Sequence, residues 1–192
     1  MKSLIDLLVR LFSKPARIEP EPVVTNDVAP PVAANKSSIT KTGAIGGVAT
    51  ASVIAAIVAF IGPWEGRRYV AYQDIVGVWT ICDGHTKGVK QGDTADDAKC
   101  DQLAAEDVAE HNAGIRQCIT REMAPNQEIA LTSLAFNVGV GAVCGSTAVR
   151  KFNAGDDNGA CEAITLWNKA GGVVVKGLVN RRAAEEALCK KG

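Results

Sequence analysis

The sequence predicts an α+β fold that is mostly helical, with a small antiparallel sheet near the N-terminal side of the domain. Residues 69–92 mix Tyr, Val, Ile and Trp with Gly and Asp turn residues, a pattern typical of short hairpins. Further along, apolar residues recur at helical spacing between glycines. The first 62 residues differ from the rest, because they hold most of the prolines, an uncharged apolar run and no cysteine.

The N-terminal arm divides into two predicted parts. In residues 1–14, MKSLIDLLVRLFSK, the charges of Asp6, Arg10 and Lys14 recur every four residues and would share one helical face. This pattern predicts an amphipathic helix lying on a membrane surface, and a floppy N-terminus is the alternative. Residues 15–41 contain five of the seven prolines and no aromatic residue, which predicts an extended linker.

Residues 42–62, TGAIGGVATASVIAAIVAFIG, carry no charge and are long enough to cross a bilayer as a helix. They contain no Leu, and more than half are Gly, Ala, Ser or Thr, so insertion should be only marginally favourable. A cleaved signal peptide is the main alternative, but such peptides start with a short charged region rather than a long arm. Lysines before the run place the N-terminus in the cytoplasm and the residues after it outside.

Residues 63–192 form the predicted globular domain. A helix is predicted from Thr94 to His111, with Thr94 as the N-cap. Further helices are predicted over Asn126–Val138, Ser146–Asn153, Asn158–Lys169 and Leu178–Cys189.

Charge and cysteine content narrow the classes of function. Lys+Arg and Asp+Glu both total 21, so the chain lacks the basic excess of a nucleic-acid-binding protein. The six cysteines all follow residue 81 and lack the spacing of a zinc site, so we expect no metal. An even number in one region favours disulfides in an oxidising compartment, with buried free thiols in a cytosolic protein as the alternative.

One group of residues has the chemistry needed to cleave a glycosidic bond. Glu65 lies beside Trp64 and is followed nine residues later by Asp74 and then by Thr80. Such cleavage needs an acid for the leaving oxygen and a carboxylate that activates water or stabilises the cation. A partly apolar environment would keep Glu65 protonated, while Asp74 on a hairpin would stay ionised and Thr80 would hold the water. On spacing alone the signal is weak, because two carboxylates nine residues apart are common and a solvated surface pair also explains them.

Three blocks resemble the T4-type phage lysozymes of glycoside hydrolase family 24. They are WEGRRYVAYQDIVGVWTICDGHT, AFNVGVGAVCGSTAVRKFNAGD and AGGVVVKGLVNRRAAEEALC, and together they cover nearly all of residues 63–192. The resemblance implies a lysozyme-like fold and hydrolysis of the β-1,4 bond between N-acetylmuramic acid and N-acetylglucosamine, without a cofactor. It implies that Glu65 is the general acid, that Asp74 positions or activates the attacking water, and that Thr80 assists Asp74.

The resemblance also assigns secondary roles. His85 matches a family histidine expected to form structural hydrogen bonds. Cleft contacts are expected from Asn137, Lys176 and Asn180. The six cysteines are expected to pair as Cys118–Cys144 and Cys161–Cys189, by resemblance, and as Cys82–Cys100, which would tie the hairpin to the next helix.

The apolar run resembles the signal-anchor-release segments of phage endolysins. This implies entry through the Sec translocon, an inactive state tethered to the host inner membrane, and release to the periplasm on depolarisation by a holin. The run has no cysteine, which excludes activation by disulfide exchange within it. We therefore expect Ile54–Pro63 to become the first helix of the domain on release. The expected substrate is peptidoglycan, and the expected state is a monomer.

Two other functions stay open at this point. A lytic transglycosylase would use one glutamate without the Asp–Thr pair and would leave a 1,6-anhydro product. A membrane-anchored murein-binding or virion protein would have a vestigial site, so that changing Glu65 would have no effect on lysis.

Overall fold

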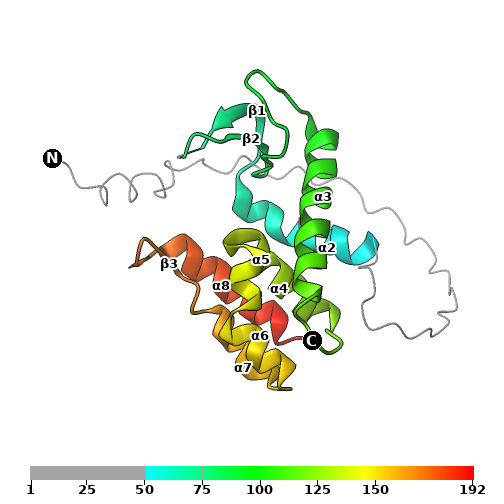
Figure 1. Ribbon diagram of the computed structural model, residues 1–192, viewed down its shortest axis with the longest axis vertical. Helices are drawn as coiled ribbons and strands as arrows, with labels where there is room; N and C mark the ends of the chain where they lie inside the picture. Colours follow the sequence, from blue (N-terminus) through cyan, green and yellow to red (C-terminus); the bar gives the residue numbers. More distant parts are fainter. Residues whose placement is uncertain (1–50, 75) are drawn as a thin grey trace, which may run out of the picture. The chain divides into compact units, whose positions relative to one another are not determined.

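The computed structural model describes residues 51–74 and 76–192 (Figure 1). The helix predicted over 1–14, the linker predicted over 15–41 and residues 42–50 of the apolar run lie outside the described residues. Within the described ranges, no helix is both long enough and apolar enough to span a bilayer.

Helix α2, Ala51–Glu65, joins the apolar run to the domain. Ile57 and Ile61 lie one turn apart on it and are completely buried, in one apolar cluster with Val108 and Ile129. The first helix therefore draws its core residues from the predicted membrane segment. The boundary predicted between residues 62 and 63 falls inside this helix.

The predicted hairpin sheet is present at the N-terminal side. Strand β1, Arg68–Gln73, pairs antiparallel with β2, Trp79–Cys82, in a register that places Tyr72 opposite Thr80. The inner side of the hairpin packs on the start of α3 in a cluster that includes Ile81 and Leu103.

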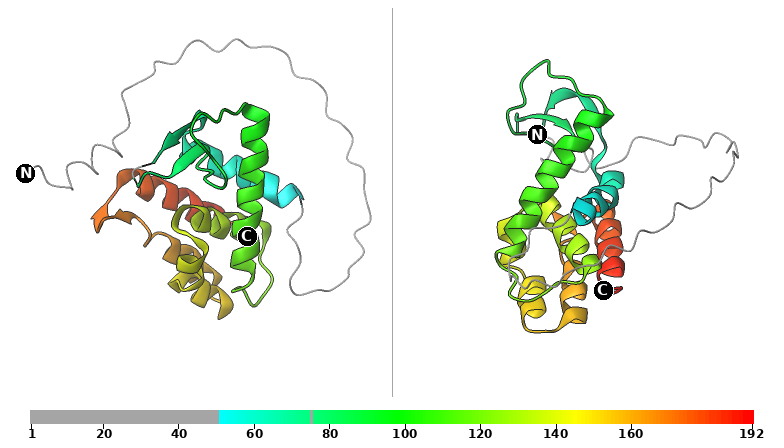
Figure 2. Two further views of the ribbon diagram at one scale, coloured as in Figure 1. Left: turned by 45° about the horizontal axis from the view of Figure 1, so that its top comes forward. Right: turned by 90° about the vertical axis from the view of Figure 1, so that its right-hand side faces the viewer.

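Helix α3, Asp97–Arg116, extends from the sheet to the remaining helices (Figures 1 and 2). Those helices are α4 (Pro125–Val138), α5 (Val140–Cys144), α6 (Thr147–Asn153), α7 (Asp157–Ile164) and α8 (Lys176–Cys189). Helix α4 lies at their centre, packed against α2, α3 and α8. Its residues from Gln127 to Ala135 are all buried. Helix α4 is thus the central buried helix, and both α2 and α8 pack against it.

Several predicted boundaries are corrected by the structure. Thr94 forms a β-bridge with Val70, so α3 starts later and is capped by Asp96, whose carboxylate accepts a hydrogen bond from the Lys99 amide. Helix α7 ends at Ile164 instead of residue 169.

Two elements were absent from the prediction. Strands β3, Lys169–Ala170, and β4, Val173–Val174, form a hairpin after α7. Gly171 and Gly172 make its turn with positive φ angles of 56° and 82°, a conformation that glycine adopts without strain. The short helix α5 was also missed.

Three disulfides join the six cysteines in the expected pairs: Cys82–Cys100, Cys118–Cys144 and Cys161–Cys189. The first ties β2 to α3, the second ties the end of α3 to α5, and the third ties α7 to α8.

Candidate active site

Glu65 is the last residue of α2, and the chain turns sharply after it. Gly66 has a φ of +68°, the left-handed conformation that often ends a helix and that L side chains adopt only with strain. This turn lets β1 begin at Arg68 and leaves the Glu65 side chain directed at another part of the fold, helix α8.

The partner of Glu65 is Arg181 on α8. Arg181 Nη1 donates to Glu65 Oε1 over 2.6 Å, and the side chains of Glu65 and Arg181 are 17% and 5% exposed. Burial raises the pKa of Glu65 above its ordinary value, while the charge and hydrogen bond of Arg181 lower it and the nearby Asp83 raises it further. The net shift is upward, which favours a protonated carboxyl, the form that a general acid needs.

Asp74 and Thr80 are held together through the backbone of Val78. Asp74 Oδ1 accepts hydrogen bonds from the amides of Val76, at 3.0 Å, and Val78, at 2.8 Å. The Val78 carbonyl accepts from the Asp74 amide at 2.9 Å and from the Thr80 hydroxyl at 3.1 Å. Among the described residues, the hydrogen bonds to the Asp74 carboxylate both reach Oδ1.

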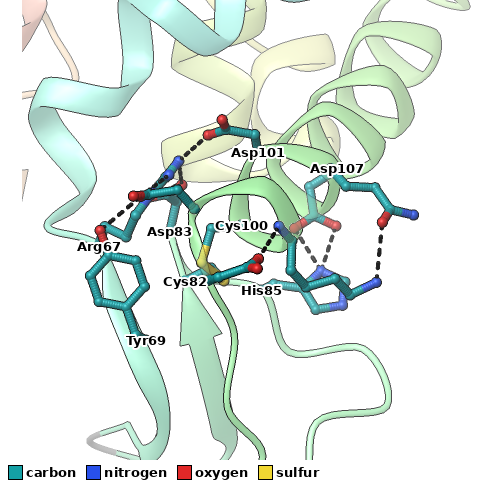
Figure 3. Close-up of a disulfide and its surroundings, with 12 residues drawn as sticks. Arg67, Tyr69, Cys82, Asp83, His85, Cys100, Asp101 and Asp107 are labelled. Atoms are coloured by element: carbon teal, nitrogen blue, oxygen red, sulfur yellow. Dashed lines mark hydrogen bonds and ion pairs between the residues drawn. A yellow bond between two sulfur atoms is a disulfide. The ribbon is translucent and has the colours of Figure 1, made fainter.

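The strand that follows Glu65 is fixed to α3 by a cluster around Arg67 (Figure 3). Arg67 Nη2 lies 2.7 Å from Asp83 Oδ2 and 2.8 Å from Asp101 Oδ1, and Nη1 lies 3.1 Å from Asp97 Oδ1. The Tyr69 hydroxyl donates to the same Asp97 oxygen. These contacts start two residues after Glu65 and therefore help to set where α2 ends.

Replacing Arg67 with alanine should destabilise the hairpin. Because the side chain of Asp83 is only 6% exposed, its carboxylate would lose its partner in a largely buried position. We expect a loss of about 2 kcal/mol in the free energy of unfolding. Thermal denaturation followed by circular dichroism measures this, as a fall in Tm of roughly 5 °C.

The matched control is Arg68→Ala, which removes the same charge from the next residue. Arg68 is exposed and stacks on the Tyr72 ring, with 4.3 Å from its guanidinium carbon to the ring centroid. We expect this variant to stay within about 1 kcal/mol of the original. Equal losses for the two variants would contradict the role given to the Arg67 cluster.

His85 ties the loop after β2 to α3. Its Nδ1 lies 2.8 Å from Asp107 Oδ2, and its Nε2 lies 3.0 Å from the Lys87 carbonyl oxygen (Figure 3). Both ring nitrogens thus face acceptors within the protein, which are the contacts of a structural hydrogen-bonding residue rather than of a proton donor to substrate.

The three expected cleft residues are all exposed. Asn137 lies in the last turn of α4, while Lys176 and Asn180 lie in the first two turns of α8. They remain predictions. The residue of α8 that reaches Glu65 is Arg181, which the sequence analysis did not single out. The pattern of α8 gave no indication of this, because arginines are rarely buried unless they are paired and the buried residues of α8 are mostly charged.

The site residues are a half-buried acid at the end of α2 and a polar carboxylate with a hydroxyl on the hairpin. In the described part of the chain, no hydrogen bond or ion pair joins Glu65 to Asp74 or Thr80. Among the described residues, no group of His, Cys, Asp or Glu side chains is arranged to hold a metal ion.

Comparisons with known proteins identify the family of the chain. The family model described as phage lysozyme matches residues 62–185. A SAR-endolysin of Enterobacteria phage P21 is 41% identical over 152 residues, which cover 78% of this chain and 92% of that protein.

Two solved structures share the fold. A point mutant of P22 lysozyme has a TM-score of 0.62 and 34% identity, covering 70% of this chain and 94% of the P22 chain. The active form of the P1 phage endolysin Lyz has a TM-score of 0.63 and 26% identity, covering 77% of this chain and 97% of the P1 chain. The mostly helical fold with its small antiparallel sheet is therefore confirmed. The chain belongs to the phage lysozyme family and is an enzyme of the lysozyme class, a glycoside hydrolase.

Proposed function

We propose that this protein is a phage endolysin that hydrolyses the β-1,4 bond between N-acetylmuramic acid and N-acetylglucosamine in peptidoglycan during host lysis. The observation that carries the proposal is Glu65, a partly buried carboxyl at the end of α2 whose pKa is raised by burial. The resemblance to lysozymes at the level of sequence and fold supports the same conclusion.

In this proposal, Glu65 donates its proton to the glycosidic oxygen as the bond breaks. Asp74, held through Oδ1 by the Val76 and Val78 amides, uses Oδ2 to orient or activate the attacking water. Thr80 donates to the Val78 carbonyl, so its hydroxyl oxygen keeps lone pairs that accept a hydrogen bond from that water.

The bond type and reaction type are tested together by digesting purified peptidoglycan and analysing the fragments by mass spectrometry. Hydrolysis at the proposed bond leaves N-acetylmuramic acid at the reducing end. A 1,6-anhydro product would identify a lytic transglycosylase, and a new reducing N-acetylglucosamine would place the cut at the other bond of the glycan.

We further propose that residues 42–62 tether the enzyme to the host inner membrane in an inactive state. The residues of α2 support this because they differ in size between its two sides. Its fully buried positions are large, Ile57 and Ile61, whereas its exposed positions before Pro63 are all small: Ala51, Ser52, Ala55, Ala56, Ala59 and Gly62. Small residues tolerate water and gain little in lipid, so the same helix suits both environments.

The two locations of α2 exclude each other. In lipid, Ile57 and Ile61 could not fill the core position beside Val108 and Ile129, and Glu65 could not reach Arg181. The tethered enzyme would therefore lack its first helix and its general acid. We propose entry through the Sec translocon, release to the periplasm as a monomer when a holin depolarises the membrane, and no role for nucleic acid.

Replacing Ala55 and Ala59 with leucine should hold the enzyme on the membrane. Both positions are exposed in the folded domain, so the fold has room for larger side chains. Each leucine improves insertion by a few tenths of a kcal/mol, about 1 kcal/mol together, which moves the ratio of membrane-bound to released protein roughly fivefold. Fractionation of host membranes before and after depolarisation measures the ratio.

The control is Ala109→Leu, an equally exposed alanine on α3. It adds the same apolar surface outside the proposed tether and should leave the ratio unchanged. If the Ala55→Leu, Ala59→Leu protein is released as readily as the original, the tether proposal is wrong.

A further inference from the structure

A second carboxylate lies behind the Glu65–Arg181 pair and has no part in the reaction described above. Glu185 on α8 is completely buried. Its Oε1 accepts hydrogen bonds from the Ser133 hydroxyl at 2.6 Å, from Arg182 Nη2 at 2.9 Å and from Arg181 Nε at 3.3 Å. Its Oε2 lies 2.7 Å from Arg182 Nε. Guanidinium groups can only donate, so this set of partners fits an ionised carboxylate.

Arg181 is therefore shared between two carboxylates. Its Nη1 donates to Glu65 over 2.6 Å, its Nε donates to Glu185, and its Nη2 donates to the Ser133 carbonyl at 3.3 Å. The guanidinium is 5% exposed, so water screens it poorly and each carboxylate affects how strongly Arg181 attracts the other.

The charges that act on Glu65 come from two directions. Arg181 and Arg182 on α8 favour its ionised form, and Asp83 in the loop after β2 favours its protonated form. Glu185 adds a negative charge beside both arginines. With Glu185 ionised, these three α8 residues present a net charge of +1 to Glu65, whereas without it they would present +2.

We propose that Glu185 is a positioning residue for the general acid: it neutralises part of the Arg181–Arg182 charge and so keeps Glu65 protonated at the pH of lysis. The inference rests on the proposed function of Glu65. The pKa of Glu185 is itself raised, because burial outweighs the lowering effects of Arg182, Ser133 and Arg181, and the pKa of Glu65 is raised by burial as well. The order in which the two glutamates titrate is therefore a direct test.

The first experiment compares pH profiles of cell-wall hydrolysis for Glu185→Gln and the original enzyme. Glutamine keeps the volume, and its carbonyl oxygen can accept the hydrogen bonds now made to Oε1, but it carries no charge and its amide nitrogen cannot accept from Arg182 Nε. The two arginines would then act on Glu65 unopposed, so the alkaline limb of the profile should move down by about one pH unit. Arg182→Gln removes a positive charge and should move the limb up, and the double variant should return it close to its original position.

The matched control is Glu186→Gln. Glu186 is the next residue of α8, and it pairs with Lys190 at 2.8 Å rather than with Arg181 or Arg182. Its replacement by glutamine removes one carboxylate, so this variant has the same net charge as Glu185→Gln. It should leave the alkaline limb in place. If Glu185 only stabilises the helix, Glu185→Gln would lower Tm without moving the limb, and that result overturns the proposal.

A measurement on the unaltered enzyme does not depend on how well a variant folds. Carbon-13 NMR of the glutamate carboxyl groups should show Glu65 titrating at higher pH than Glu185, and a lower midpoint for Glu65 in Glu185→Gln. Ionisation of Glu65 while Glu185 is still protonated overturns the proposal. The NMR midpoints do not depend on activity, so they remain decisive even if Glu65→Gln proves active and the proposed function fails.

Discussion

Glu65→Gln is expected to abolish cell-wall hydrolysis while leaving the protein folded. Glutamine has almost the same volume, and its carbonyl oxygen can still accept the hydrogen bond that Arg181 Nη1 now donates to Glu65. It cannot donate a proton to a glycosidic oxygen, so we expect a loss of about a thousandfold in rate. The measurement is the fall in turbidity of permeabilised Gram-negative cells, with Tm recorded for the same preparation.

Asp74→Asn tests the second carboxylate of the site in the same turbidity assay. Asparagine can still accept the hydrogen bonds from the Val76 and Val78 amides, so the turn should persist, but it cannot act as a base. We expect a loss of at least about a hundredfold. The control is Glu110→Gln, which removes a carboxylate from an exposed position on α3. If Glu65→Gln lyses cells at the rate of the control, the enzyme uses another acid or the site is vestigial.

The pH dependence expected of the original enzyme follows from the direction of the shift at Glu65. Its pKa is raised mainly by burial, so the protonated, active form persists above the pH at which an exposed glutamate ionises. Activity should fall as the pH rises through this elevated pKa, and Glu65 should therefore set the alkaline limb.

The local elements that carry Glu65 and Thr80 were predictable from the sequence, and the side chains that surround Glu65 were less so. Glu65, Asp74 and Thr80 belong to one continuous stretch, where helix end, hairpin and turn residues are all visible in the sequence. Arg181 reaches Glu65 across 116 positions of the chain, and only the packing of α8 against α4 brings it there. No periodicity in the sequence carries that information.

Helix α5 and the β3–β4 hairpin were not predicted, and the physical reasons differ. Helix α5 is only five residues long, contains Gly141 and two β-branched valines, and lies between Gly139 and Gly145, so its own helix propensity is poor. The burial of Val143 and the Cys118–Cys144 disulfide hold it in place instead. The β3–β4 hairpin did have a local indication, because the pair Gly171–Gly172 directly before two valines is typical of a two-residue turn.

Reduction of the disulfides is expected to unfold the domain at 37 °C. The three bridges close segments with sequence separations of 18, 26 and 28 residues, and these segments follow one another without overlap. Their effects on the unfolded chain should therefore add. At about 3 kcal/mol each, they contribute roughly 9 kcal/mol, which is comparable to the whole stability of a typical domain.

The test is to unfold the enzyme in denaturant, reduce it, and remove the denaturant in the presence or absence of reductant. Circular dichroism and turbidity assays should show a folded, lytic enzyme only when the disulfides re-form. A matched variant, Cys161→Ser with Cys189→Ser, should lose about a third of the effect and refold partially. A reduced protein that melts cooperatively above 37 °C would contradict this expectation.

Two of the three disulfides lie in elements that carry or adjoin the site residues, so their formation would affect when the enzyme becomes active. One bridge fixes β2, the neighbour of the strand that leads to Asp74, and another fixes α8, which carries Arg181. In a reducing compartment, neither the β1–β2 hairpin nor α8 would be held in place by its disulfide, whatever the position of α2. If the chain is exported as proposed, oxidation would complete the hairpin and α8, and the site would then need only α2 to bring Glu65 to Arg181. The fold would in this way require two successive changes of environment before the acid and its partners meet.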